Sequence, residues 1–101
     1  MEIELRDYVT APGLLDDWIR GWSEGIMPIR ERCGFQLLGA WVDRPQNRFV
    51  WVIGYYGPGG FDAAEERYHS LAERGALHPE PSSFVQTAEI TRVAPISRDR
   101  V

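Results

Sequence analysis

The sequence predicts one α+β domain of the ferredoxin-like type, with the order strand, helix, strand, strand, helix, strand. Three observations predict it. A chain of 101 residues has room for a single domain. Two segments carry apolar residues at helical spacing, and four segments have the alternation or the β-branched and aromatic content of strands. Right-handed crossovers then give a four-stranded antiparallel sheet of order 4-1-3-2 with both helices on one face.

The first strand is expected over residues 2–9, where apolar and polar residues alternate. Ile3, Leu5 and Val9 fall on one side, and Glu4, Arg6 and Tyr8 fall on the other. Thr10 is a candidate N-cap for the helix that follows.

Apolar residues recur every three or four positions in the next segment and predict one helical face. They are Leu15, Trp18, Ile19, Trp22, Ile26 and Ile29. Pro28 lacks a backbone N–H and is expected to distort this helix, with Gly25 easing the kink. Gly34 is suited to end the helix as a C-cap residue.

The second half of the chain supplies the remaining elements. Residues 35–42 and 49–56 read as two strands joined by a loop over 43–47, and both strands are apolar at nearly every position. A helix is expected over 61–74, a short helical turn over 82–84 and the last strand over 86–95. The domain thus spans 1–95, and 96–101 is expected to be a flexible, charged C-terminal tail.

The second face of the predicted sheet has no helices to cover it. We expect this bare face to include Tyr8, Phe49, Trp51 and Tyr55. A monomer rarely exposes such an apolar patch, so the sequence predicts a homodimer in which a second copy covers it.

Composition excludes several function classes. The net charge is −4 and all eleven basic residues are scattered arginines, so no basic stripe for nucleic acid is present. Without lysine, the chain has no residue for a pyridoxal Schiff base or a P-loop. Cys33 is the single cysteine, so no intramolecular disulfide is expected. With no visible signal peptide or apolar span, cytoplasmic residence is the expectation.

Arg6, Tyr8 and His69 are the candidate catalytic residues. Arg6 could orient an anionic or carbonyl group between the sheets with Tyr8 as a hydrogen-bond donor; the favoured alternative pairs Arg6 with Glu4 or Glu89. His69 could act as a general base at the mouth of a cavity, although a solvent-facing helix residue is the simpler interpretation.

Four aromatic residues are the candidate ligand-binding set: Tyr8, Trp41, Trp51 and Tyr55. They could wall an apolar pocket, or they could serve only core and interface packing. No metal site is expected, because His69 and His78 lack a third ligand at metal-site spacing, and no cofactor is expected. The Gly57-Pro58-Gly59-Gly60 segment lacks the spacing of a phosphate-binding fingerprint and is interpreted as a turn.

Several segments resemble the NIPSNAP family of the dimeric α/β-barrel superfamily. They are Glu4-Leu5-Arg6-Asp7-Tyr8, Ala11-Pro12-Gly13 with Leu15 and Trp18, Gly34-Phe35 leading to Leu37-Leu38-Gly39-Ala40-Trp41, and the positions around Asn47, Val50 and Tyr55. The resemblance covers roughly residues 2–95. It implies a ferredoxin-like fold and a homodimer whose sheets enclose a barrel-like space, but no agreed set of catalytic residues.

Two functions remain open at this point. One is a homodimer that binds a small apolar or aromatic molecule between its sheets, with cofactor-independent oxygenase-like or isomerase-like activity as an extension by analogy with the wider superfamily. The other is a non-catalytic structural or interaction dimer whose interface is filled by side chains.

Overall fold

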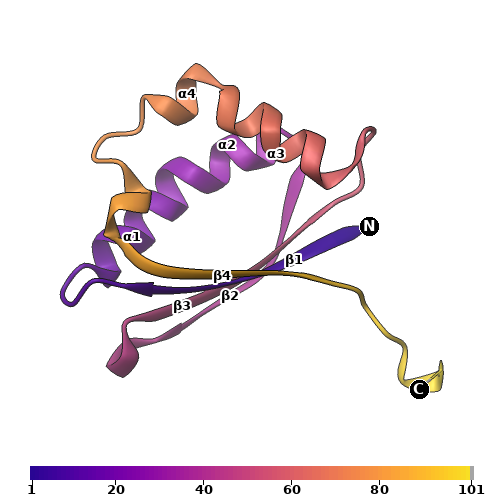
Figure 1. Ribbon diagram of the computed structural model, residues 1–101, viewed down its shortest axis with the longest axis horizontal. Coiled ribbons are helices and arrows are strands. Elements are labelled where there is room, and N and C mark those ends of the chain that lie inside the picture. Colours follow the sequence, from indigo (N-terminus) through magenta and orange to yellow (C-terminus); the bar gives the residue numbers. More distant parts are fainter. Residues whose placement is uncertain (101) are drawn as a thin grey trace.

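A computed structural model describes residues 1–100 and confirms the predicted order of elements (Figure 1). The strands are β1 (Glu2–Thr10), β2 (Phe35–Asp43), β3 (Arg48–Tyr55) and β4 (Val85–Val93). The helices are α1 (Leu15–Gly21), α2 (Met27–Arg32), α3 (Gly60–Ser70) and α4 (Ala72–Gly75). A π-helical turn, η1 (Trp22–Ile26), joins α1 to α2, and short 3₁₀ turns are η2 (Arg44–Gln46), η3 (Pro81–Phe84) and η4 (Arg98–Arg100).

The four strands form one antiparallel sheet in the order β2-β3-β1-β4, which is the predicted order read from the other edge. Helices α1, α2 and α3 lie on one face of this sheet, and the opposite face has no covering layer (Figure 1). The molecule is correspondingly thin, with extents of 43 × 34 × 18 Å.

Pro28 distorts the first helix as predicted. In a regular α-helix the residue at position 28 would donate its N–H to the carbonyl four residues earlier, which a proline cannot do. Instead, the helix widens into the π-helical turn η1 directly before α2, and Pro28 lies in the first turn of α2. Trp18 and Trp22 before Pro28, and Ile29 after it, are all buried.

The predicted helix cap at Thr10 was wrong. Thr10 is the last residue of β1, and its hydroxyl donates to the backbone oxygen of Asn47 at 3.3 Å. α1 begins later, after Leu14, without a side-chain cap. Pro12 and Gly13 form the turn between β1 and α1. Thr10 therefore lies too early in the chain to cap α1, and its hydroxyl bonds to the loop before β3 instead.

The second helix is shorter than predicted. Leu71 takes an extended conformation, which ends α3 at Ser70 and leaves α4 as a single turn. Arg74 of α4 then donates to both carboxylate oxygens of Glu80, at 2.7 and 2.9 Å. This pair fixes the segment that leads through η3 into β4.

The prediction of which sheet face these aromatic side chains occupy was wrong. Tyr8, Phe49, Trp51 and Tyr55 are buried beneath the helices, each with less than a tenth of its surface exposed. Register places Phe49 opposite Tyr8 and Trp51 opposite Arg6, so all of these side chains share the helix-covered face. The alternation in β1 was correct, but its polar side faces the core.

The core is an aromatic layer between the sheet and the helices. Trp22 packs edge-on against Phe49 and Trp51, with ring centroids 4.8 and 5.8 Å apart, and Trp18 contacts Tyr8 at 5.4 Å. Such edge-to-face pairs stabilise a core beyond the area they bury.

The chain after β4 extends away from the sheet (Figure 1). Ile96 is 81% exposed, and the predicted tail reaches Val101, which lies outside the described residues. Within residues 1–100, no helix combines the length and the apolarity needed to span a membrane.

Candidate functional site

Four charged side chains meet between the sheet and the helices, and we call them the buried ion cluster: Glu4, Arg6, Arg30 and Glu65. Arg6 donates to Glu4 Oε1 from Nε at 2.9 Å and from Nη2 at 2.6 Å, and it also donates to Glu65. Its Nη1 lies 3.1 Å from the Tyr8 hydroxyl. Arg30 donates to the other oxygen of Glu65 at 2.5 Å. The two guanidinium groups therefore share one carboxylate.

Arg30 is the most deeply buried member, with 2% of its surface exposed. Its guanidinium lies 4.0 Å from the Tyr68 ring centroid, 5.1 Å from that of Phe35 and 5.5 Å from that of Trp51. Aromatic faces attract a cation, and the carboxylate of Glu65 supplies the opposite charge. Together these contacts offset the desolvation of a charge in the core.

The cluster favours the charged forms of Glu65 and Arg6. Burial alone would raise the pKa of Glu65, but the charge and hydrogen bond of Arg30, together with Arg6, hold that pKa below its usual value. Burial would lower the pKa of Arg6, yet Tyr8, Glu65 and Glu4 raise it further above its usual range. Two arginines and two carboxylates thus balance each other inside the domain.

His69 lies at the outer edge of this cluster. Its Nε2 is 3.9 Å from Glu65 Oε1, and 57% of its side chain is exposed. Burial lowers the pKa of His69, and Glu65 opposes this shift only in part. The imidazole is therefore a weaker base than a free histidine side chain.

Two buried donors beside the cluster have no acceptor in the part of the chain that the structure describes. They are Nε of Arg30 and Nε1 of Trp51. Buried polar groups are nearly always paired, and an unpaired one is costly. A water or a ligand oxygen in this layer would satisfy them.

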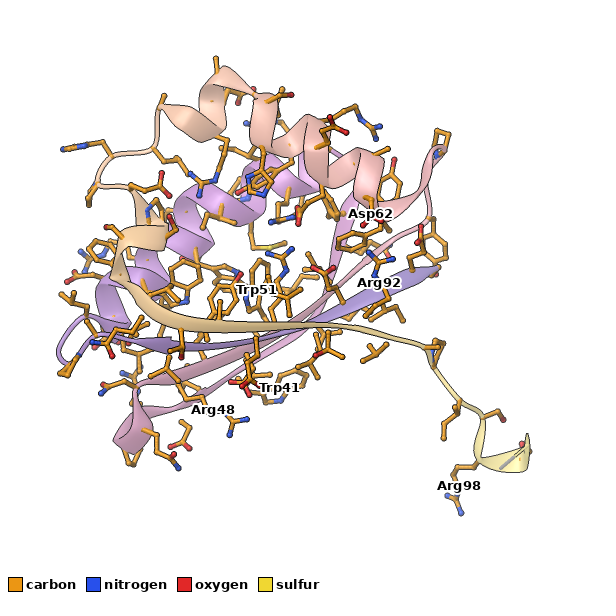
Figure 2. All side chains as sticks on the ribbon, in the orientation of Figure 1. Trp41, Arg48, Trp51, Asp62, Arg92 and Arg98 are labelled. Atoms are coloured by element: carbon orange, nitrogen blue, oxygen red, sulfur yellow. The ribbon has the colours of Figure 1, made fainter. Side chains whose placement is uncertain are left out.

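The uncovered face of the sheet, which we call the open face, carries an apolar group of side chains together with polar residues of β4 (Thr87, Glu89 and Thr91). Its aliphatic residues come from β1, β3 and β4 and are Ile3, Leu5, Val9, Val50, Val52 and Val93. Trp41, on β2, is opposite Val50 and is 59% exposed. Figure 2 shows Trp41 and Arg48 on this side and Trp51 on the helix side.

A glycine and an ion pair shape the open face. The indole of Trp41 lies over Gly39, where any Cβ would clash with it. Arg48 donates to both oxygens of Asp7, at 2.6 and 2.8 Å, and this hydrogen bonding lowers the pKa of Asp7. Asp7 and Arg48 therefore neutralise each other, while Glu89 of the edge strand β4 lies opposite Asp7 on the same face.

The structure separates the residues that the sequence grouped together. The pairing of Arg6 with Glu4 is confirmed, whereas Glu89 lies opposite Asp7 on the open face and does not reach Arg6. Arg6 and Tyr8 meet beside Trp51 in the helix-covered layer, and Tyr55 lies elsewhere in that layer against Phe35. Trp41 alone of the predicted ligand-binding set is on the open face.

Arg30 and Glu65 were missed by sequence reasoning. A signal was present, because Arg30 follows Ile26 by four positions and so falls within the apolar stripe of the first helix. Glu65 likewise lies three positions before Tyr68 on the apolar side of the second. A charge within such a stripe indicates a buried partner on another element.

The glycine-rich segment before α3 is a turn, as predicted. Gly59 and Gly60 both have φ of +83°, a conformation that favours glycine. The Glu2 carboxylate accepts the backbone N–H of Phe61 at 2.7 Å, so an internal anion occupies the start of α3. Within residues 1–100, no three His, Cys, Asp or Glu side chains gather in the manner of metal ligands.

The fold and its buried ion cluster define a ferredoxin-like α+β protein with helices on one side of the sheet only. The family model described as NIPSNAP matches residues 3–89, and the chain belongs to this family. No curated protein matches.

Solved structures share the fold. An uncharacterised NIPSNAP domain protein from Burkholderia xenovorans superposes with a TM-score of 0.83 at 19% identity, covering 97% of each chain. A NIPSNAP family protein from Agrobacterium tumefaciens gives 0.84 at 17% identity, covering 96% of this chain and 94% of that one. An antibiotic biosynthesis monooxygenase gives 0.69 at 14% identity, covering 96% and 100%. At these identities the likeness establishes the fold and no activity.

Proposed function

We propose that the chain works as a homodimer whose two open faces pack together, and that a small apolar or aromatic molecule binds at this seam. The observation that carries the proposal is the open face itself, with Trp41 59% exposed among valine, leucine and isoleucine side chains. A water-exposed apolar face of this kind is unfavourable for a monomer, and a second copy would cover it. We further propose that this dimer resides in the cytoplasm.

The ion pair on the open face is compatible with this packing. Asp7 and Arg48 form a two-bonded pair and would enter the interface already neutralised. Glu89 lies opposite Asp7 on the edge strand β4, at the margin of the proposed seam. A flat indole over Gly39 offers a stacking surface for an aromatic ligand. Trp41 is therefore the side chain on which ligand binding at the seam would depend.

Sedimentation velocity at micromolar concentration tests the dimer. We expect the wild type to sediment with twice the protomer mass and Trp41→Glu to sediment as a folded monomer. Tyr56→Glu is the matched control, because Tyr56 is 70% exposed but lies beyond the end of β3. A monomeric wild type would refute the proposal.

Native mass spectrometry of freshly purified protein tests the ligand. We expect a dimer peak with added mass, and loss of that added mass in Trp41→Ala. A dimer without added mass in both proteins would leave the homodimer standing and remove the ligand from the proposal.

The second candidate function is a non-catalytic dimer with a filled interface. It is favoured by the internal pairing of Arg6 with Glu4, Glu65 and Tyr8, which leaves neither Arg6 nor Tyr8 free to face a partner. His69 belongs to α3, on the other side of the sheet from the seam. Oxygenase-like or isomerase-like chemistry with these residues would therefore need a substrate in the helix-covered layer, beside the buried ion cluster.

A further inference from the structure

A groove of about 440 Å³ lies on the helix side of the molecule, away from the open face. One wall is a face of the α1–η1 helix, and the other is the segment from Leu77 to Phe84. This segment runs down beside α1 on its way from α4 to β4 (Figure 1). The volume is within the range of sites that hold small organic molecules.

Two glycines bring the walls of the groove together. A Cβ on Gly21 would lie 3.2 Å from Pro81, and a Cβ on Gly25 would lie 2.9 Å from Leu77. The two positions are four residues apart and so share one helix face. Larger residues there would push the second wall away, so the close approach depends on these glycines.

The second wall is held in place by hydrogen bonds of its own. Arg74 binds Glu80 through two nitrogens, and Glu80 Oε1 also accepts the hydroxyl and the N–H of Ser82, at 2.8 and 3.1 Å. The backbone oxygen of Phe84 accepts the N–H of Ala11 at 3.0 Å. The groove is therefore pre-formed, which reduces the entropy that a ligand would lose on binding.

The lining combines an apolar base with a rim that carries two acids, Asp17 and Glu24, together with Arg20 and His78. Leu77, Pro79, Pro81 and Phe84 supply the apolar surface. On the rim, Asp17 has Arg20 as a partner at 4.0 Å, whereas Glu24 has no ion-pair partner within residues 1–100. With the His78 imidazole neutral, the rim thus has a net charge of −1, located at Glu24, beside an apolar slot.

We infer that this groove is a binding site for a small organic amine. Its ammonium group lies at Glu24, and its apolar or aromatic body lies against Pro81 and Phe84. A neutral ligand would gain the apolar contacts but lose the ion pair, and an anionic ligand would be repelled by Glu24. The groove and the proposed dimer seam lie on opposite sides of the sheet, so an experiment can refute either proposal without refuting the other.

Three indole compounds test the inference by titration of ¹⁵N-labelled protein followed by amide chemical shifts. Tryptamine carries the cation, tryptophol replaces it with a hydroxyl, and indole-3-propionate replaces it with an anion. We expect saturable shifts at residues 17–25 and 77–84 with tryptamine, binding weaker by about fivefold with tryptophol, and none with indole-3-propionate. Equal binding of tryptamine and tryptophol, or no saturable shifts at these residues, would overturn the inference.

Two variants locate the charge. Glu24→Gln is expected to weaken tryptamine binding by about fivefold, because it removes the rim charge and keeps the side-chain shape. Glu31→Gln is the matched control, since Glu31 is an exposed acid on α2 that does not line the groove. Equal affinity of wild type and Glu24→Gln would contradict the assignment of the amine to Glu24.

Discussion

Glu65 Oε1 accepts a hydrogen bond from Arg30 Nη1 at 2.5 Å, and this contact joins α3 to α2 over the centre of the sheet. The same carboxylate accepts a bond from Arg6 of β1 through its other oxygen. One glutamate thus connects three elements and neutralises charge in the interior. Its loss would leave Arg30 without a carboxylate partner among residues 1–100.

Replacing Glu65 by alanine should therefore be strongly destabilising. Removing one partner from a buried ion pair typically costs about 3–5 kcal/mol, because the remaining charge stays desolvated. We expect a loss toward the lower end of that range, since a fifth of the Glu65 side chain is exposed. Urea unfolding followed by circular dichroism at pH 7 measures it.

Glu66→Ala is the control for this change, because Glu66 is the exposed neighbour on the same helix. It should alter the free energy of unfolding by no more than about 0.5 kcal/mol. If Glu65→Ala and Glu66→Ala unfold at the same urea concentration, the buried ion cluster has no stabilising role.

Acid should weaken the domain partly through Glu80. The hydrogen bond from Arg74 lowers the pKa of Glu80 from 4.5 to about 2. A carboxylate with a lowered pKa in the folded state contributes stability that is fully present above its unfolded value and is lost as the pH falls toward the folded value. The contribution of Glu80 should therefore disappear between about pH 5 and pH 2.

The measurement is Tm between pH 6 and pH 3 for wild type and Glu80→Gln. The wild type should lose Tm more steeply, because the variant no longer has this titrating group. Glu65 and Asp7 also have lowered pKa values but are present in both proteins, so the difference isolates Glu80. Parallel curves would contradict the prediction.

His69 should titrate below the usual histidine value. Burial is the largest cause of its lowered pKa, and Glu65 is the carboxylate that raises it. In Glu65→Gln the pKa of His69 should fall further, because the opposing charge is gone while Arg30, Arg74 and Arg6 remain. Imidazole proton shifts followed by NMR measure both values; an upward shift in Glu65→Gln would show that Glu65 does not act on His69 as described.

Trp41 should report dimer formation through acrylamide quenching. Trp18, Trp22 and Trp51 are at most 8% exposed, whereas Trp41 is 59% exposed in the protomer. If the open faces pair, all four indoles are protected in the wild type at micromolar concentration. Leu5→Glu, which places a charge on the open face, should expose one quenchable indole.

Trp41→Phe in the Leu5→Glu background is the control, and it should remove the quenchable component. A wild type with one freely quenched tryptophan at micromolar concentration would mean that the open face is bare in solution.

Local sequence determined the elements of this protein and their order. The alternation of residues 2–9, the helical spacing from Leu15 to Ile29 and the break at Pro28 each depend on neighbours along the chain, and the structure confirms them. The sheet order followed as well, because right-handed crossovers leave few alternatives.

Only the tertiary structure decided which face of the sheet is the core. Alternation defines two faces of β1 but not which one the helices cover. Hydrophobicity favoured Ile3, Leu5 and Val9, yet Glu4, Arg6 and Tyr8 are buried instead. The physical reason is that Glu65, 59 residues from Arg6, supplies a charge partner that is brought there by the packing of α3 on the sheet.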